Sequence, residues 1–291
     1  MNNISFAFIL TILAGLSTMI GSIFIFKKKN ENLVIAALAF ASGVMFTVSI
    51  TDLIPESYNL LINIFPKFPS IIYMLIFVVS GIIFSMFIDK YIPTDNNLYR
   101  VGVFAMLAII IHNIPEGIAT FMATNTNIML GISLTIAIAL HNIPEGISIS
   151  IPIYYATNSK FKAIFYTFIS AVSEPFGALL TYLFLSNYIN DRIMGFLFGI
   201  IAGIMIHISM YELLPTSKSY NKLNLTYLFF VLGIIVMLIN HFVFWEIFVI
   251  INVVSVLRWK NKKDLKLGIY DSKTIKRNNI NFIKAKIKRF R

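Results

Sequence analysis

The six residues His-Asn-Ile-Pro-Glu-Gly occur twice in this sequence, at 112–117 and again at 141–146. Both copies lie within long apolar segments. Residues three and four apart share one face of an α-helix, so each copy turns its His, Asn and Glu to the same side. The proline removes one backbone N–H and frees the carbonyl four residues back. Such polar groups are tolerated in an apolar helix where they line a cavity or meet a ligand. The doubled motif therefore predicts two helices that share a polar site.

The composition around the motif is typical of an integral membrane protein. Of 291 residues, 58% are hydrophobic and only 13% are charged, whereas a soluble domain has about 25% charged residues. The chain has no cysteine, which excludes disulfides and thiolate metal sites. It also lacks the G-x-x-x-x-G-K-[ST] phosphate-binding loop, so nothing in it indicates an ATP-driven pump. The apolar N-terminal segment is too long for the hydrophobic part of a signal peptide, and we interpret it as a first membrane span.

Eight apolar segments are long enough to cross a bilayer. They are residues 4–26, 33–54, 70–88, 101–123, 129–153, 163–187, 193–213 and 225–250. Each is continuously apolar and does not alternate, which disfavours a transmembrane β-barrel. Because helices then remain as the spanning element that satisfies its own backbone, we expect an all-α membrane protein with eight transmembrane helices.

The charges of the connections predict the orientation of these helices. The connections after the first, third, fifth and seventh segments carry nine Lys and Arg residues, and the other connections carry two. The excess of positive charge puts the first set in the cytoplasm and, with eight spans, both termini outside.

A basic tail follows the membrane region. We predict an eight-helix transmembrane domain over 1–257 and a tail over 258–291 that is disordered or lies on the membrane surface. The tail holds 13 Lys or Arg and two Asp, which accounts for the whole net charge of +11. Counting spans places the tail outside, whereas a bend of the last segment near His241 places it inside. Both positions stay open, as does binding of the tail to anionic lipid.

A second repeat links the second and seventh segments. The stretch G-V-M-F-T-V-S-I-T-D-L-I-P-E-S at 43–57 corresponds to G-I-M-I-H-I-S-M-Y-E-L-L-P-T-S at 203–217, at a constant offset of 160 residues. Asp52 thereby aligns with Glu212. The two stretches run in opposite directions across the membrane, and so do the two His-Asn-Ile-Pro-Glu-Gly segments. We therefore predict a 3+2+3 inverted-repeat bundle, an arrangement typical of transporters.

Three acidic residues are expected near the middle of the membrane. Glu116 and Glu145 belong to the doubled motif, and Glu174 precedes Pro175 in the sixth segment. An ionised carboxylate is costly at this depth unless it is paired, and these segments offer no Lys or Arg, so we expect a divalent cation to supply the missing charge. Imidazole, amide and carboxylate groups all bind Zn²⁺, Fe²⁺ and Mn²⁺. The candidate ligands for one or two ions are His112, Asn113, Glu116, His141, Asn142, Glu145 and Glu174, with Met45 either as a soft ligand or as a gap-filling core residue.

Other polar residues of the spans are weaker candidates for a functional role. His207 aligns with Thr47 in the second repeat, and we expect a structural or pathway role for it. His241 and Glu246 suit helix packing or an interface. Acids near the helix ends either attract cations to a pathway or are simply interfacial; these are Asp52, Glu56 and Glu212.

These motifs resemble those of the ZIP (Zrt/Irt-like) family of divalent-metal transporters, and most closely its bacterial ZupT-type branch. The resemblance covers roughly residues 1–250 and rests on H-N-I-P-E-G-I-A-T-F, L-H-N-I-P-E-G, S-E-P-F-G-A and A-G-I-M…E-L-L-P. It implies both termini outside, a homodimer in the cell membrane, and uptake of zinc, with tolerance for iron, manganese, cobalt or cadmium. Zinc would be the transported substrate, and neither a cofactor nor a nucleic acid partner is implied.

The resemblance also implies a binuclear site whose shared glutamates bridge two ions. One position would use His112, Glu116, His141 and Glu145, with Met45 nearby; the other would use Asn113, Glu116, Asn142, Glu145 and Glu174. Two features depart from the family pattern. The connection 89–100 lacks the histidines that many relatives carry there, so no metal relay is expected in this loop, and the basic tail has no counterpart in the family.

We expect this chain to transport by alternating access and not to be an enzyme. An intramembrane metalloenzyme would need a water-activating motif such as H-E-x-x-H, which is absent. A proton-coupled carrier of an organic solute could use the same acids as a relay, but an anionic solute calls for a Lys or Arg in the core. A metal receptor that does not transport is a further alternative, which a flux assay distinguishes.

Overall fold

The computed structural model describes residues 3–92, 96–185 and 188–242. Residues Met1–His241 form one compact unit, which is the part considered below. The predicted tail at 258–291, Glu246 and the end of the eighth apolar segment lie outside the described residues. The domain boundary at 257 therefore stays a prediction.

The described residues contain helices and turns and no β-strand. The helices are α1 (Asn3–Gly21), η1 (Ser22–Phe26), α2 (Glu31–Val48), η2 (Ser49–Leu53), α3 (Ile54–Leu61), α4 (Lys67–Lys90), α5 (Asn97–Thr126), α6 (Ile128–Thr157), α7 (Lys160–Leu180), η3 (Thr181–Leu185), α8 (Asp191–His207), η4 (Ile208–Leu213), α9 (Leu214–Lys218) and a last helix, Leu223–Phe242. Joined end to end, they make eight helices in the described part that are long and apolar enough to cross a membrane. The predicted all-α membrane fold is confirmed.

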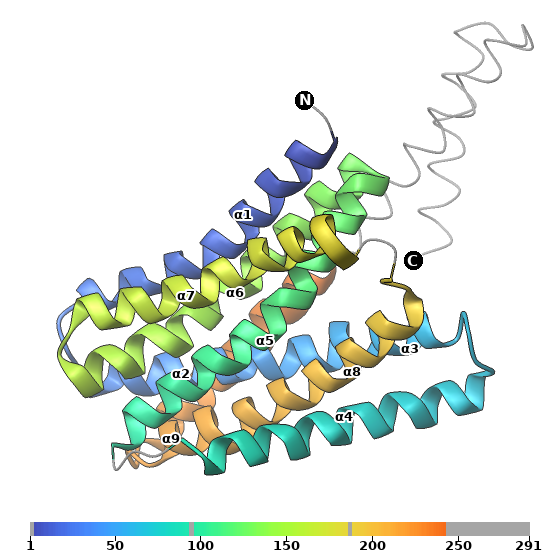
Figure 1. The fold of residues 1–291 in the computed structure, drawn as a ribbon. Coiled ribbons are helices and arrows are strands. Elements are labelled where there is room, and N and C mark those ends of the chain that lie inside the picture. The colour runs from blue at the N-terminus through green and yellow to red at the C-terminus, as the bar shows by residue number, and fades with distance from the viewer. Residues whose placement is uncertain (1–2, 93–95, 186–187, 243–291) are drawn as a thin grey trace, which may run out of the picture. The chain divides into compact units, whose positions relative to one another are not determined.

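Helices α1, α5, α6 and α7 pack closely into one group (Figure 1). A Cβ on Gly117 would lie 1.9 Å from the carbonyl oxygen of Glu174, and one on Gly146 would lie 1.8 Å from that of Thr18. Only a residue without a side chain allows the backbones to approach so closely. The glycine that ends each motif thus seats α5 against α7 and α6 against α1. This contact fixes the depth at which the preceding Glu of each motif lies.

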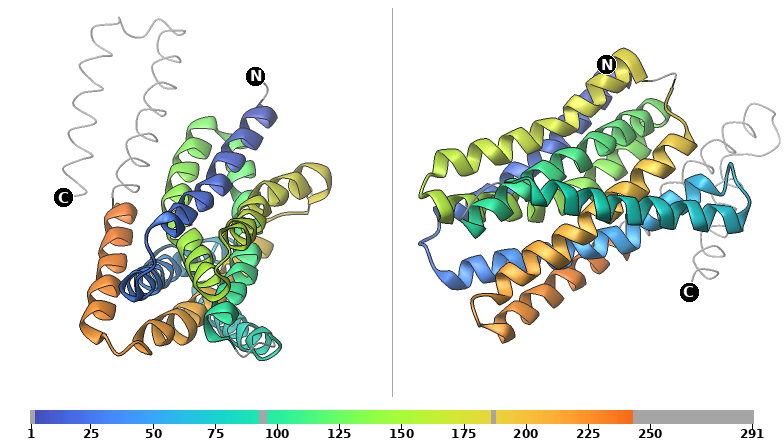
Figure 2. Two further views of the ribbon diagram at one scale, coloured as in Figure 1. Left: turned by 90° about the vertical axis from the view of Figure 1, so that its left-hand side faces the viewer. Right: turned by 60° about the horizontal axis from the view of Figure 1, so that its bottom comes forward.

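The second group contains α2, α4, α8 and the last helix, which lie together in the views of Figure 2. A Cβ on Gly43 would lie 2.2 Å from the carbonyl oxygen of Phe230, and one on Gly203 would lie 2.0 Å from that of Val78. Glycines therefore seat α2 against the last helix and α8 against α4. The two groups meet where α2 contacts α6 and α5 contacts α8.

A π-helical turn interrupts the second and the seventh spans at equivalent places. The N–H of Ile54 donates to the carbonyl of Ser49, and the N–H of Leu214 donates to that of Ser209. Proline follows in both cases, and its missing N–H and bulky ring favour this wider turn. The matched turns, together with the matched contacts of Gly43 and Gly203, support the predicted inverted repeat, which itself stays a prediction.

Candidate metal site

The packing of α5 on α6 brings the two His-Asn-Ile-Pro-Glu-Gly copies face to face. His112 Nε2 lies 3.2 Å from Glu116 Oε1 and 3.4 Å from Glu145 Oε1. His141 Nε2 lies 3.0 Å from the same Glu116 oxygen. The ring centroids of the two histidines are 6.2 Å apart. All four side chains are buried. Two imidazoles and two carboxylates thus converge on one point inside the bundle.

This convergence has the dimensions of a metal site. One ligand atom each from His112, Glu116 and His141 lies within 4.8 Å of the others, and a zinc ion bound at about 2.0–2.2 Å requires its ligands at similar spacing. Within the described residues, no hydrogen bond reaches His112 Nδ1, Glu116 Oε2 or Glu145 Oε2. Buried polar atoms in native proteins normally have partners. Buried atoms without hydrogen bonds are therefore what we expect of side chains that bind a cation.

The asparagines of the motifs lie in a second cluster with Glu174. Asn142 Nδ2 donates to Glu174 Oε2 at 3.0 Å and to the carbonyl oxygen of Ala14 at 3.0 Å. Asn113 Nδ2 donates to the carbonyl oxygen of Ser170 at 3.2 Å. Because the amide nitrogens are committed to these acceptors, the amide oxygens are left to accept. Both Oδ1 atoms and Glu174 Oε1 are buried and have no partner within the described part of the chain. These three oxygens suit a second cation.

Helices α1 and α7 hold the asparagines in the same way. The carbonyl oxygen of Ala14 also accepts from Ser17 Oγ at 2.5 Å, and that of Ser170 also accepts from Ser173 Oγ at 2.6 Å. Each asparagine therefore shares a main-chain acceptor with a serine one turn further along. Sequence reasoning missed this role of α1, because the acceptor is a main-chain carbonyl and the stretch Ala14-Gly-Leu-Ser17 carries no charged side chain that would mark it.

In the part of the chain that the structure describes, neither lysine nor arginine is buried beside the acids of this region. The buried residues in the described ranges include Glu116, Glu145 and Glu174 but neither Lys nor Arg. Three carboxylates in an apolar surrounding therefore have two imidazoles and two amides as polar neighbours, and none of these carries a permanent positive charge. A divalent cation is the simplest group that supplies the counter-charge.

Met45 lies in the hydrophobic core on α2 and is fully buried. Its surroundings there are those of a packing residue. Its role as a soft ligand stays a prediction.

The other polar residues of the spans lie elsewhere in the described helices. His207 Nδ1 lies 3.0 Å from Ser85 Oγ, and its ring stacks on Tyr211. His241 Nδ1 lies 2.6 Å from Asp52 Oδ1 at one end of the bundle. Glu212 instead pairs with Arg100 at 3.0 Å, and Glu56 is exposed. These residues are thus separate from the two clusters of α5, α6 and α7.

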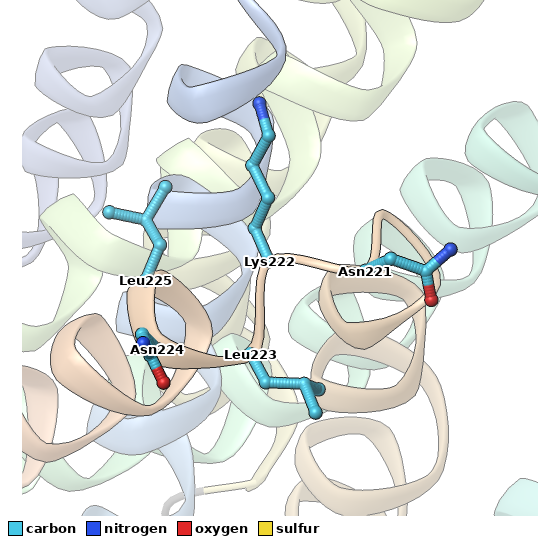
Figure 3. A pocket seen from close by; sticks show the side chains of 5 residues that line it. All are labelled: Asn221, Lys222, Leu223, Asn224 and Leu225. Carbon is cyan, nitrogen blue, oxygen red and sulfur yellow. The ribbon is translucent and has the colours of Figure 1, made fainter.

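A surface hollow is separate from the buried clusters. It is lined by five consecutive residues, Asn221–Leu225, in the turn after α9 and at the start of the last helix (Figure 3). Lys222 in this turn donates to Asn32 Oδ1 at 2.8 Å and lies 3.6 Å from Glu31 Oε2. None of the candidate metal ligands lines this hollow, so it has no part in the site.

Comparison with known proteins agrees with this geometry. The family model described as ZIP Zinc transporter matches residues 93–241, a range that holds both motifs and Glu174. Zinc transporter ZupT of Clostridium perfringens is 38% identical over 278 residues, covering 84% of this chain and 98% of that protein. Zinc transporter ZupT of Streptococcus mutans is 38% identical over 256 residues, covering 82% and 97%. That of Chlorobium phaeovibrioides is 40% identical over 261 residues, covering 82% and 98%.

Proposed function

Because the chain belongs to the ZIP family, we propose that it moves divalent metal cations, zinc above all, across the cell membrane into the cytoplasm. Zinc is in this account the transported substrate and not a cofactor. The relatives are named as zinc transporters, which supports transport over the metalloenzyme and receptor alternatives. The observation that carries the proposal is the buried convergence of His112, His141, Glu116 and Glu145.

The proposed site holds two ions in adjacent positions. The first uses the two histidines with Glu116 and Glu145, whose atoms already face one another. The second uses the unpaired oxygens of Asn113, Asn142 and Glu174. Since one oxygen of each motif glutamate has no hydrogen bond in the described residues, it is free to bridge the two positions. A site without thiolates exchanges its ions readily, as transport requires.

The proposed mechanism is alternating access between the two helix groups. The group of α1, α5, α6 and α7 carries every proposed ligand except Met45, and glycine contacts hold it together. The group of α2, α4, α8 and the last helix has its own glycine contacts and meets the first at α2–α6 and α5–α8. A movement of one group against the other would open the site first to the outside and then to the cytoplasm. The low positive charge of the outer connections supports this orientation of the chain.

Zinc uptake into proteoliposomes tests this function. Glu116→Gln, Glu145→Gln and Glu174→Gln keep the shape of each side chain and remove its charge, and each should lower the initial rate of ⁶⁵Zn uptake at least about tenfold. Glu31→Gln is the matched control, since the Glu31 side chain is 71% exposed and pairs only with Lys222 in the described part. Full uptake by the three site variants would reject the proposed site. No uptake by the unaltered protein would reject transport itself.

The rival carrier of an organic solute makes a different prediction in the same assay. It would show uptake of the solute without zinc, and zinc would act at most as an inhibitor. The buried site has no Lys or Arg to bind an anionic group, so we expect zinc flux.

The homodimer is likewise a proposal, and light scattering of the detergent-solubilised protein tests it.

A further inference from the structure

Arg100 joins three helices at one end of the bundle. Its Nη1 lies 2.6 Å from Asp89 Oδ1 at the end of α4, and its Nη2 lies 3.0 Å from Glu212 Oε2 on η4. The three helix ends, α4, α5 and η4 with α9, lie close together in Figure 1. Two carboxylates therefore share one guanidinium, which can bond both at once because its donors form a planar fork.

The two bonds of Arg100 differ in what they connect. Asp89 and Arg100 are 11 residues apart and flank the short connection from α4 to α5. Glu212 is 112 residues away and lies on another span. Its side chain is only 7% exposed, so the pair is less screened by solvent than a surface salt bridge. Arg100 belongs to α5 in the first helix group, whereas both of its partners belong to the second group.

No other ion pair in the described ranges crosses between the two helix groups. The pairs of His112 and His141 lie within the first group. The pair Lys222–Glu31 and the pair His241–Asp52 lie within the second. A relative movement of the groups can leave all of these intact, but it must stretch or break the bonds of Arg100.

We propose that Arg100, Asp89 and Glu212 form an ion-pair latch that holds the two helix groups together at this end. This inference rests on the proposed function, in which the groups move and this end faces the cytoplasm. While the latch is closed, the route past Phe104 and His207, whose rings meet between α5 and α8 at 5.9 Å, stays shut. Release of the ion then requires Arg100 to leave Glu212. The latch therefore sets how often the inner end opens.

Thiol labelling measures this opening directly, because the natural chain contains no cysteine. Phe104→Cys places one thiol at the buried contact between α5 and α8. Its reaction with a membrane-impermeant maleimide, in detergent and without metal, follows the fraction of open molecules when opening is fast. All further substitutions are made in this Phe104→Cys background, so the reporter is constant.

The latch predicts a specific order of labelling rates. Arg100→Gln and Glu212→Gln should each raise the rate about tenfold or more, the change that follows from losing one partly buried charge pair. The matched control Lys222→Gln breaks an ion pair at the same end but within the second group, and its rate should stay unchanged. The exchanged pair Arg100→Glu with Glu212→Arg should bring the rate back toward the starting value.

Two results would overturn the latch. One is a labelling rate in Glu212→Gln that equals that of the starting protein. The other is an equal rise in Lys222→Gln, which would indicate general loosening. If Arg100→Gln does not fold, Glu212→Gln still decides, because it removes the charge of the long-range pair and keeps Arg100–Asp89. Labelling is measured without zinc flux, so the two proposals are tested separately. The labelling rates can contradict the latch while zinc uptake is normal, and zinc uptake can be absent while the labelling rates follow the predicted order.

Discussion

The two motif asparagines differ from their histidine and glutamate neighbours because an amide stays uncharged at every pH that the protein meets. Asn113 and Asn142 each give their Nδ2 hydrogens to a main-chain carbonyl on a neighbouring helix. Their oxygens are thereby oriented in advance and stay available at any pH. The two asparagines are therefore neutral ligands beside the ionisable Glu174. Helices α1 and α7 are needed at the second position because they supply the main-chain carbonyls that orient the amides.

Asn142→Leu tests this role of the amide. Leucine is similar in size but can neither bind a cation nor donate to the carbonyl of Ala14, so we expect the number of tightly bound zinc ions per chain to fall by one. Equilibrium dialysis followed by metal analysis measures it. Ser17→Ala removes a hydroxyl from the same carbonyl, where it donates at 2.5 Å, and should leave the stoichiometry unchanged. Unaltered zinc binding in Asn142→Leu would show that the amide is not a ligand.

Among whole helices, glycine decides which pairs can approach. At an open helical position, replacing Gly by Ala stabilises by roughly 0.5–1 kcal/mol. At Gly117 the added Cβ would meet the main-chain carbonyl of Glu174 at 1.9 Å. Main chain cannot turn aside as a side chain can, so α5 and α7 must separate.

Gly117→Ala should therefore destabilise the protein by about 1–3 kcal/mol, as overpacking does elsewhere, and it should weaken zinc binding because Glu174 moves away from Asn142. Thermal unfolding in detergent, with and without zinc, measures both effects. Gly199→Ala is the control on α8, where the nearest atom to an added Cβ, Phe77 Cβ, lies 3.0 Å away. A Gly117→Ala protein as stable as the original would contradict the close packing of α5 on α7.

At the scale of the full bundle, the charges of the connections predict the orientation in the membrane. The positive-inside rule places the turn at Asn63 outside and the start of the last helix, at Asn224, in the cytoplasm. Both residues are exposed. Asn63→Cys and Asn224→Cys each give the chain a single thiol.

In intact cells an impermeant maleimide should label Asn63→Cys and should reach Asn224→Cys only after permeabilisation. The opposite pattern would contradict the proposed orientation of the chain while leaving the metal site untouched.

Much of this molecule could be predicted from its sequence because its apolar segments and repeated motif are local signals. Eight spans follow from segment length, and the shared faces of His112 and Glu116 follow from their spacing. Contacts between distant helices could not be predicted. The carbonyl of Ala14 has no sequence signature as an acceptor, and the pairing of Arg100 with Glu212 depends on how α5 and η4 pack. In the sequence, Arg100 could be interpreted only as one of the positive charges that predict the orientation of the helices.

We propose that the imidazoles of His112 and His141 bind the transported zinc inside the bundle. Zinc-edge X-ray absorption of the purified, zinc-loaded protein tests this most directly. We predict nitrogen and oxygen ligands at about 2.0–2.1 Å, with an imidazole signal that is lost in the double variant His112→Ala, His141→Ala and retained in the control Glu31→Gln. A zinc shell without imidazole in the unaltered protein, or an imidazole signal that survives the double variant, would contradict it.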